Sequence, residues 1–195
     1  MLFFSFDMTG ANRFMGLNRV MSGQKPALFL DRDGVINRDK GYVSQIADFE
    51  WIDGAAACIR NFNARDWHVF VVTNQSGIAR GLYTEADMTT LHSWMVEQLG
   101  QQGAKIDRIY HCPFHAEGEI AAYRKDSYDR KPKPGMLMQA MADFPVNREA
   151  SFLIGDKLTD IQAAHAAGVG AFLFEGDNLE TFAEWALADF EQGAR

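Results

Sequence analysis

The 195-residue chain has few cysteines, no long apolar run and no excess of basic residues, and each scarcity excludes a class of proteins. Its two cysteines, Cys58 and Cys112, are too few for a disulfide framework, so we expect a reducing compartment, the cytoplasm. The 19 basic residues are outnumbered by 26 acidic ones, which gives a formal net charge of −7. Binding to a nucleic-acid backbone needs clustered positive charge, so we expect no nucleic-acid partner.

The missing apolar run is equally informative. No stretch is long enough to span a bilayer, and the first twenty residues interrupt their apolar side chains with Asp7, Arg13 and Arg19, unlike a secretory leader. We interpret residues 1–24 as an N-terminal extension and residues 25–195 as one domain. The hydrophobic content of 47% is sufficient for a core of that size, and we expect a monomer without membrane contact.

Short apolar runs alternate with helical patterns along this domain. The runs end in polar residues, as buried parallel strands do where they lead into a ligand site. The alternation predicts an α/β fold with a Rossmann-like, doubly wound parallel sheet, in which ligands bind beyond the carboxyl ends of the strands. The predicted strands are 27–30, 69–72, 152–154 and 171–174, and the predicted helices are 53–65, 84–101, 134–141, 159–168 and a last one after Asn178.

Two helix starts carry the pattern of a capping box, in which a side chain before the helix and one in its first turn exchange hydrogen bonds with the backbone. Thr84 with Asp87 forms one such pair, and Thr159 with Gln162 forms the second. Gly168 is placed to end the helix that Thr159 begins. These signals predict the boundaries of two helices that flank the polar strand ends.

Asp31 and Asp33 follow the first predicted strand, two residues apart, so their side chains leave the backbone on the same side. One carboxylate as nucleophile and the other as acid and base would suit transfer of a phosphoryl group that a divalent cation activates. Asp156 ends a third predicted strand and could complete an oxygen shell for Mg²⁺ that Asp31 begins. Taken alone, the two aspartates could equally end a strand in a polar turn.

Further polar residues fall at the other predicted edges. Thr73 and the residues after it can cradle phosphate oxygens with a hydroxyl and backbone N–H groups, or can form a hydrophilic turn. Lys131 precedes a helix and could stabilise the charge of a phosphoryl transition state, although such basic runs are more often exposed loops. Arg80 lies between two glycines near the same rim, and it could equally be a solvated surface residue. Residues 112–133 form one long irregular segment, a candidate binding loop.

The conjunction of these motifs is more specific than any one of them. In their order and spacing the sequence resembles the haloacid dehalogenase superfamily of phosphatases, through Asp31, Asp33, Thr73, Lys131 and Asp156. The resemblance covers nearly everything from residue 27 to 174. Longer matches resemble the branch of histidinol-phosphate and sugar bisphosphate phosphatases; they are 29–34, 37, 41–43, 72–81, 110–113, 130–132 and 155–157.

The resemblance implies a role for each matching residue. It implies Asp31 as the nucleophile, Asp33 as general acid and then base, and Thr73 and Lys131 as stabilisers of the phosphoryl group. It implies Mg²⁺ held by Asp31, the backbone carbonyl of Asp33, and Asp156. It also implies a fold without a large cap domain and a small phosphorylated metabolite as the substrate. The implied substrate contacts are Asp39, Lys40, Gly41, Tyr42, Asn74, Gln75, Ser76, Arg130 and Lys157.

In one respect the chain departs from that branch. Many of its members pin the substrate-specificity loop, here residues 112–133, with zinc through a Cys-x-His and a Cys-x-Cys. The corresponding positions here are Cys112, Phe114, Ser127 and Asp129, so only one of the four expected ligands is present. We therefore expect no zinc and expect packing and hydrogen bonds to hold the loop instead.

Three alternatives remain open at this point. The substrate could be another small phosphorylated metabolite, because the specificity loop is the part that diverges. The chain could be a catalytically silent sugar-phosphate-binding domain, although such a domain would not need a general acid. A dinucleotide-binding fold is disfavoured because Gly168-Val-Gly170 precedes a strand and does not join a strand to a helix. We assign no role to His68, His92 and His165, which lie in helical or strand-edge patterns.

Overall fold

The computed structural model describes residues 23–193, so nearly all of the extension expected at residues 1–24 lies outside the described residues. A five-stranded sheet runs through the middle of the domain in the order β3-β2-β1-β4-β5, with every neighbouring pair parallel. This confirms the predicted α/β class. The strands are β1 (Ala27–Leu30), β2 (His68–Asn74), β3 (Arg108–Cys112), β4 (Phe152–Gly155) and β5 (Gly170–Leu173).

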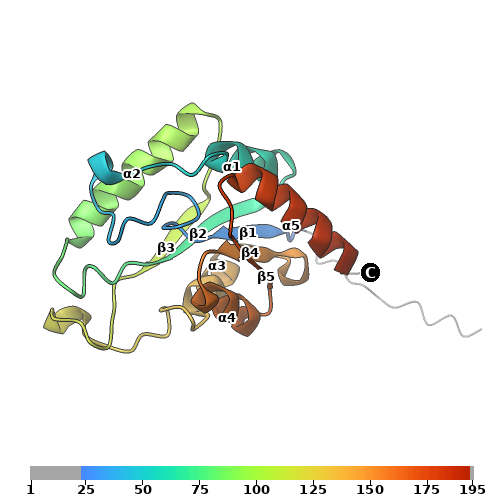
Figure 1. Ribbon diagram of the computed structural model, residues 1–195. Helices are drawn as coiled ribbons and strands as arrows, with labels where there is room; N and C mark the ends of the chain where they lie inside the picture. Colours follow the sequence, from blue (N-terminus) through green and yellow to red (C-terminus); the bar gives the residue numbers. More distant parts are fainter. Residues whose placement is uncertain (1–22, 194–195) are drawn as a thin grey trace, which may run out of the picture.

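Within residues 23–193, five α-helices cover the two faces of the sheet (Figure 1). Two separate apolar cores lie between the layers. Helices α1, α2 and α5 pack on one face, and α3 and α4 pack on the other. The helices are α1 (Ala55–Ala64), α2 (Glu85–Gln101), α3 (Gly135–Asp143), α4 (Leu158–Ala167) and α5 (Leu179–Gly193). None of the described helices is long and apolar enough to cross a membrane.

Strand β1 shows why the sequence forms a sheet covered on both sides. Its four residues are fully buried, and successive side chains point to opposite faces of the sheet. Leu28 and Leu30 enter the core beneath α1, α2 and α5, whereas Ala27 and Phe29 enter the core above α3 and α4. The continuous apolar run is therefore what a central parallel strand requires.

The strand order places a binding crevice at the carboxyl end of β1. Strand β2 pairs with one side of β1, and β4 pairs with the other side. The connection after β1 therefore leads to one side of the sheet, and the chain later crosses to the opposite side to form β4. Ligands of doubly wound sheets bind at such a switch point, because the loops diverge there and leave a gap. The residues that follow β1, β2 and β4 consequently face one another.

Three of the expected helix signals are confirmed. The Thr84 side chain accepts a hydrogen bond from the Asp87 N–H (3.1 Å), and Asp87 Oδ2 accepts one from the Thr84 N–H (2.9 Å). Gly168 ends α4 in the left-handed conformation, with φ of 74°. Asn178 also starts α5 as expected, since its Oδ1 accepts a hydrogen bond from the Thr181 N–H (3.0 Å).

Two expectations were wrong. The capping residue of α4 is Lys157, not Thr159, and Asp160 Oδ2 accepts the Lys157 N–H (3.0 Å) in place of Gln162. Thr159 lies inside the first turn of α4. The next residue, Asp160, has a shorter side chain than Gln162, and its carboxylate reaches back to the backbone N–H of Lys157. Strand β3 was not predicted, because this edge strand begins with exposed Arg108 and so lacks a continuous apolar run.

Candidate active site

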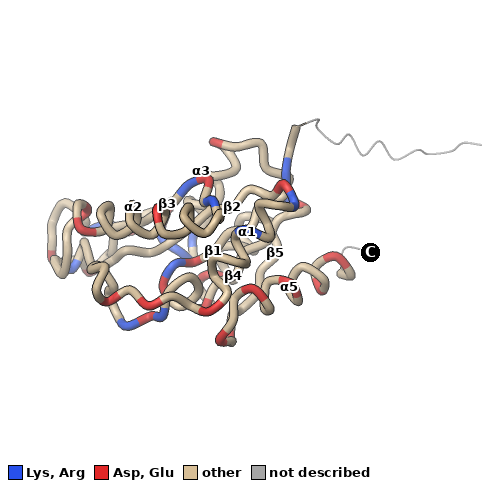
Figure 2. The backbone as a smooth tube through the Cα atoms, turned by 90° about the horizontal axis from the view of Figure 1, so that it is seen from above, with Lys and Arg blue, Asp and Glu red and all other residues tan. Residues whose placement is uncertain are grey.

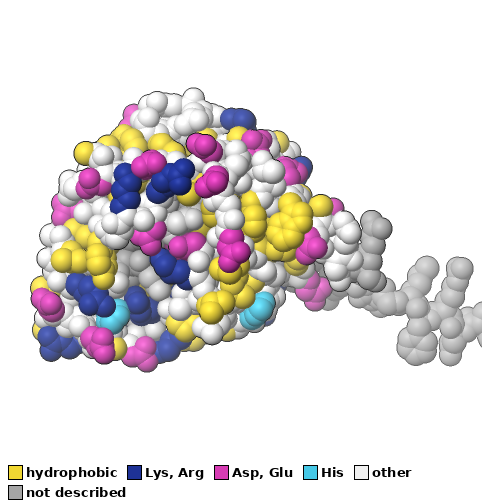
Figure 3. All heavy atoms as spheres, viewed as in Figure 1, with side chains coloured by type: hydrophobic (Ala, Val, Ile, Leu, Met, Phe, Trp, Pro, Cys, Tyr) yellow, Lys and Arg dark blue, Asp and Glu magenta, His cyan; other side chains and the backbone are white. Residues whose placement is uncertain are grey.

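Polar residues from the carboxyl ends of β1, β2 and β4 line one cavity of about 380 Å³. Figure 3 shows this face hollowed, with acidic and basic side chains around the hollow. The structure brings most of the site residues predicted from the sequence to this cavity. Those in its lining are Asp31, Asp33, Asp39, Gly41, Tyr42, Thr73, Asn74, Ser76, Arg130, Lys131 and Lys157, and Tyr83, Thr159 and Asp160 line it without having been predicted.

Lys131 is the buried cation of this cavity, with only 2% of its surface exposed. Its Nζ lies 3.0 Å from Asp31 Oδ1 and 2.6 Å from Asp160 Oδ1, and it donates a hydrogen bond to the Val72 carbonyl (2.8 Å). The Asn74 side chain holds the Lys131 backbone on both sides, accepting its N–H and donating to its carbonyl, each at 3.1 Å. An ammonium fixed this firmly can face developing negative charge without first reorganising.

Asp160 is the most deeply buried of the lining residues that the sequence did not predict. Its side chain is 1% exposed, and it both caps α4 and pairs with Lys131. Gly155 makes room for it, because a Cβ at that glycine would lie 2.2 Å from the Asp160 Cβ. In the first turn of α4, its negative charge also interacts favourably with the helix dipole. The available signal was the glycine before Asp156, which leaves space for a side chain from the next helical turn.

The electrostatics of the cavity favour binding a cation. Burial raises the pKa of Asp31 to about 7 against the opposing pull of Lys131, and the negative charges of Asp160 and Asp33 raise it further. Burial favours the neutral form of Lys131, yet the carboxylates of Asp31 and Asp160 raise its pKa above the ordinary value. Burial likewise raises the pKa of Asp156. Asp31 and Asp160 share the Lys131 ammonium, and Asp156 has only the half-exposed Lys157 Nζ at 3.5 Å. A divalent cation among these three carboxylates would balance their remaining negative charge. Figure 2 shows the acidic and basic segments next to one another near β1 and β4.

Three of these carboxylates fit a hard divalent cation. Oxygens of Asp31, Asp156 and Asp160 lie within 4.8 Å of one another, and this is the only cluster of three or more potential metal-binding side chains among the described residues. Asp156 Oδ1 is buried and has no hydrogen-bond partner in the described part of the chain. Gly34, with φ of 89°, allows Asp156 to approach, since a Cβ there would lie 2.2 Å from Asp156 Oδ2. Carboxylate oxygens in this arrangement suit Mg²⁺.

Asp33 is held at the same edge by donors from three directions. Its Oδ1 accepts hydrogen bonds from Arg32 Nη2 (2.8 Å) and Asn37 Nδ2 (3.0 Å), and its Oδ2 accepts one from Gln75 Nε2 (3.1 Å). Gln75 is itself positioned by the Tyr83 hydroxyl, which donates to Gln75 Oε1 (2.6 Å). Gln75, expected to contact substrate, therefore lies behind the cavity and orients Asp33.

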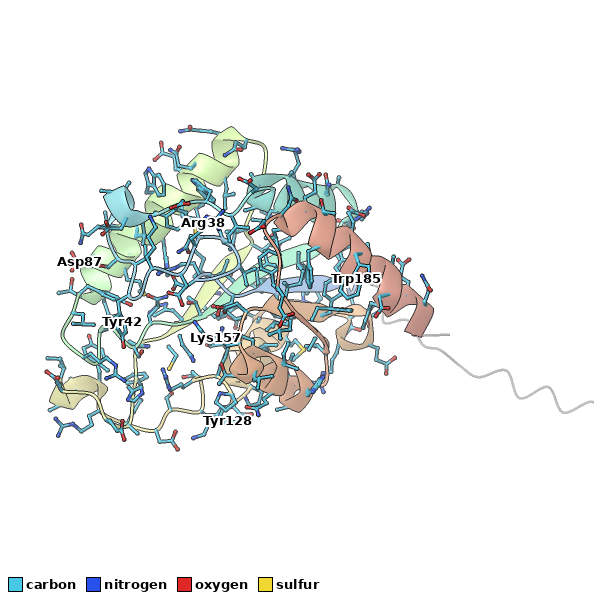
Figure 4. All side chains as sticks on the ribbon, in the orientation of Figure 1. Arg38, Tyr42, Asp87, Tyr128, Lys157 and Trp185 are labelled. Atoms are coloured by element: carbon cyan, nitrogen blue, oxygen red, sulfur yellow. The ribbon has the colours of Figure 1, made fainter. Side chains whose placement is uncertain are left out.

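The outer rim of the cavity is formed by the turn after β1 and by the start of α4. Lys157 Nζ donates to Asp39 Oδ2 (2.9 Å), which joins these two segments. Gly41 and Tyr42 both have positive φ, 76° and 54°, so the turn presents the half-exposed Tyr42 ring at the rim. Figure 4 labels Tyr42 and Lys157 here. Lys40, predicted to bind substrate, does not line the cavity and pairs with Glu50 (2.9 Å).

The loop of residues 112–133 holds other side chains at three of the four positions where many members of the resembled branch have zinc ligands. Cys112 is buried, and Ser127 donates a hydrogen bond to Asp129 Oδ2 (3.3 Å). The Phe114 ring packs against Tyr123, with ring centroids 6.0 Å apart, and Lys125 Nζ lies 3.7 Å from its centroid. An aromatic ring and a hydroxyl cannot replace thiolate or imidazole, so these residues do not fit zinc.

Arg124 and Arg130 fasten this loop through the backbone. Arg124 donates to the carbonyls of Gly118 and Glu119, the latter at 2.9 Å. Arg130 donates to the Phe114 carbonyl (3.4 Å) and also lines the cavity. Arg80, which the sequence placed near the rim, lies beside His115 (3.4 Å) and outside the cavity lining.

Comparisons with known proteins agree with this geometry. The HAD-hydrolase-like family model matches residues 128–181. The chain is 45% identical over 171 residues to the D-glycero-beta-D-manno-heptose-1,7-bisphosphate 7-phosphatase of Rhodopseudomonas palustris, covering 88% of this chain and 95% of that protein. It is 42% identical over 184 residues to the protein of the same name from Escherichia coli strain K12, covering 90% and 96%.

Solved structures show the same likeness in three dimensions. A putative HAD-like phosphatase from Mesorhizobium loti is 33% identical with a TM-score of 0.79, and 89% of each chain is covered. The D,D-heptose 1,7-bisphosphate phosphatase from B. bronchiseptica, complexed with magnesium and phosphate, is 31% identical with a TM-score of 0.71, covering 84% of this chain and 99% of that one.

Proposed function

Because the chain belongs to the haloacid dehalogenase-like phosphatase family that includes the D-glycero-beta-D-manno-heptose-1,7-bisphosphate 7-phosphatases, we propose that it removes the 7-phosphate of that heptose bisphosphate. The observation that carries the reaction class is the buried Lys131 ammonium between Asp31 and Asp160 at the switch point of the sheet. The assignment of the substrate rests on similarity to these relatives across nearly their whole length.

Asp31 is the nucleophile in this proposal. Its Oδ1 takes the contacts with Lys131 and with the Arg32 N–H (2.7 Å), which leaves Oδ2 to attack phosphorus. A bond forms between Asp31 Oδ2 and phosphorus while the bond from phosphorus to the sugar oxygen breaks, giving an aspartyl phosphate. Lys131 and the Thr73 hydroxyl, both at the cavity wall, stabilise the charge on the phosphoryl oxygens.

Asp33 is the proposed general acid and base. In the first step it donates a proton to the departing sugar oxygen, and in the second it removes a proton from the water that attacks the aspartyl phosphate. Inorganic phosphate and free Asp31 result. Gln75 and Asn37 orient the Asp33 carboxylate through the hydrogen bonds described above.

We propose Mg²⁺ as the cofactor and no zinc. The carboxylates of Asp31 and Asp156 and the backbone carbonyl of Asp33 would hold the ion, with Asp160 close by. Bound there, Mg²⁺ neutralises phosphate charge and makes phosphorus more electrophilic. The orphaned Asp156 Oδ1 and the excess of carboxylates over ammonium groups support this assignment.

The proposed substrate contacts come from the rim of the cavity and from the carboxyl end of β2. Asp39, Gly41 and Tyr42 would contact the sugar, and Asn74 and Ser76 with their backbone would contact the reacting phosphate. Arg130 and Lys157 supply positive charge around the opening. We further propose that the protein acts as a cytoplasmic monomer on this small molecule, with no nucleic-acid or membrane partner.

A phosphate-release screen tests the substrate. Heptose 1,7-bisphosphate should be hydrolysed with the highest kcat/KM and should yield the 1-phosphate, whereas heptose 7-phosphate, hexose phosphates and histidinol phosphate should be poorer. A preference for histidinol phosphate would replace the substrate and keep the chemistry. No phosphate release from any of these compounds would favour a silent binding domain.

Trapping of the covalent intermediate tests the chemistry. Asp33→Asn should lose about 10²–10⁴-fold in turnover, because general acid–base catalysis is worth about that much. Acid quench and mass spectrometry of this variant should find phosphate on Asp31. An unmodified Asp31 during slow turnover of the substrate would exclude the aspartyl-phosphate route.

A further inference from the structure

Arg32 lies between the two catalytic aspartates in sequence, and its side chain is buried, with 1% of the residue exposed. One of its terminal nitrogens, Nη2, donates to Asp33 Oδ1 (2.8 Å) and to the Val43 carbonyl (2.6 Å). The other, Nη1, lies 3.1 Å from His92 Nε2 on α2. A single planar guanidinium thus joins the acid–base residue, the rim of the cavity and a helix of the covering layer.

The bond to Val43 matters because of what precedes it. Gly41 and Tyr42 turn the chain through two positive φ values and line the cavity, and Val43 is buried directly after them. Holding the Val43 carbonyl fixes the inner end of this turn. The same Nη2 atom therefore sets the position of the Asp33 carboxylate relative to the wall of the cavity.

His92 determines how the guanidinium is oriented. Arginine can only donate hydrogen bonds, so His92 Nε2 must accept and the proton of a neutral imidazole must sit on Nδ1. Burial lowers the pKa of His92 to about 3, with the charges of Arg32 and His111 adding to the shift, so the ring is a neutral acceptor under physiological conditions. With its Nη1 occupied, the guanidinium has its plane fixed, and Nη2 is aimed at Asp33 and Val43.

We propose that Arg32 and His92 are positioning residues that align Asp33 for proton transfer, with His92 acting through Arg32. This inference rests on the proposed phosphatase function. Arg32 Nε is already buried without a partner in the described part of the chain. If the acceptor at His92 is lost, Nη1 is left unsatisfied as well, and this added cost favours rotation of the guanidinium. Rotation would pull Nη2 away from Asp33 Oδ1, leaving Asn37 and Gln75 to hold the carboxylate in a looser position.

The test compares His92→Leu with His92→Gln, because the Gln amide oxygen can occupy the place of Nε2 and accept from Arg32. Ser93→Ala is the matched control; it lies beside His92 on α2 in the groove between α2 and β3. Single-turnover formation of the aspartyl phosphate is measured with a sugar phosphate, whose leaving oxygen needs a proton. It is measured again with p-nitrophenyl phosphate, whose leaving group departs without one.

We expect His92→Leu to slow phosphoryl transfer from the sugar phosphate about tenfold, a fraction of the full worth of a general acid, with KM unchanged. Transfer from p-nitrophenyl phosphate should change less than about twofold, and His92→Gln and Ser93→Ala should resemble the wild type with both substrates. In an Asp33→Asn background, His92→Leu should have no further effect, because the residue it positions is already disabled.

Equal slowing with both substrates would mean a general structural role and would overturn the proposal. So would additivity with Asp33→Asn, or failure of His92→Gln to restore the rate. If His92→Leu does not fold, His92→Asn takes its place, since its shorter amide cannot reach Arg32. A wild-type protein that releases phosphate from no compound would instead refute the phosphatase function, so the two failures are distinguishable.

Discussion

The strand-end cluster and the loop of residues 112–133 solve the same problem, holding polar groups in place, in opposite ways. The strand-end cluster consists of Asp31, Lys131 and Asp160, which are buried and come from three separate segments, with Lys131 supplied by the C-terminal end of residues 112–133. In the rest of the loop many bonds are local, such as those from Arg124 to the carbonyls five and six residues before it. Its ion pair between Lys133 and Asp126 is solvent-exposed.

The difference teaches which part of the molecule is free to change. A buried carboxylate that loses its partner keeps a large desolvation cost, so the cluster tolerates few substitutions. Exposed pairs are worth little, because water and salt replace them readily. The loop can therefore exchange its means of attachment, which in the proposed function would alter substrate choice and leave the chemistry of the cluster unchanged.

The largest effect should come from Asp31→Asn in the cluster. Removal of the proposed nucleophile should lower kcat at least about 10⁴-fold. The fold should persist, because a neutral amide avoids the burial cost of the Asp31 charge and the repulsion from Asp160 and Asp33, while Lys131 keeps its pairing with Asp160. Phosphate release and thermal denaturation measure the two quantities. Asp66→Asn, at an exposed aspartate, is the matched control and should leave both unchanged. Wild-type turnover in Asp31→Asn would refute the covalent mechanism.

A smaller effect should follow from Asp160→Asn. The amide retains the shape of the side chain, but it weakens the hold on Lys131 and removes one negative charge from the three carboxylates that would hold Mg²⁺. We expect about a tenfold higher Mg²⁺ requirement, the loss typical for groups that support metal ligands. Titration of activity with Mg²⁺ measures this, and Mg²⁺-dependent thermal stabilisation gives a second readout. An unchanged Mg²⁺ requirement would show that Asp160 serves only to cap α4.

The contrast between the cluster and the loop also explains which features of the site could be predicted from the sequence. Asp31, Asp33 and Asp156 were predictable, because each ends a continuous apolar run and parallel strands bring such ends together. The buried position of Asp160 was not predictable in the same way. It depends on which residue caps α4. The sequence favours Thr159 with Gln162, whereas the structure has Lys157 with Asp160.

Other missed features have the same cause. Strand β3 lies at the edge of the sheet and is half exposed, so its sequence lacks the apolar continuity that revealed β1 and β4. Gln75 was expected at the substrate, and His92 was given no role. Their hydrogen bonds to Asp33 and Arg32 join segments 42 and 60 residues apart, which no local pattern encodes.

In the loop, Phe114→Ala should have a modest effect on substrate binding. The Phe114 ring packs against Tyr123 and Lys125, and its carbonyl accepts from Arg130, a residue of the cavity wall. Loosening this contact should raise KM about fivefold, corresponding to about 1 kcal/mol, and leave kcat within about twofold. Steady-state kinetics measure both, with Lys133→Ala as a control in the same loop. A large fall in kcat would join the loop to the chemistry and break the comparison.

The smallest effect should come from removing zinc, because the loop should hold none. Structural zinc prefers four nitrogen or thiolate donors, and Phe114 and Ser127 stand where two of them would be. Cys112 and Asp129 alone cannot enclose an ion, and Arg124 and the Phe114 contacts fasten the loop without one.

Elemental analysis of protein purified without chelators should therefore find far less than one zinc per chain. A zinc-selective chelator should leave the melting temperature unchanged at saturating Mg²⁺, and Cys112→Ser should show the same zinc content as the wild type. The triple substitution Phe114→His, Ser127→Cys, Asp129→Cys supplies the missing donors beside Cys112, and it should gain zinc together with a zinc-dependent rise in melting temperature. About one zinc in the wild type, lost with thermal stability in Cys112→Ser, would mean that the loop recruits other ligands. The loop would then depend on a metal as the cluster does, and the difference between the two regions would disappear.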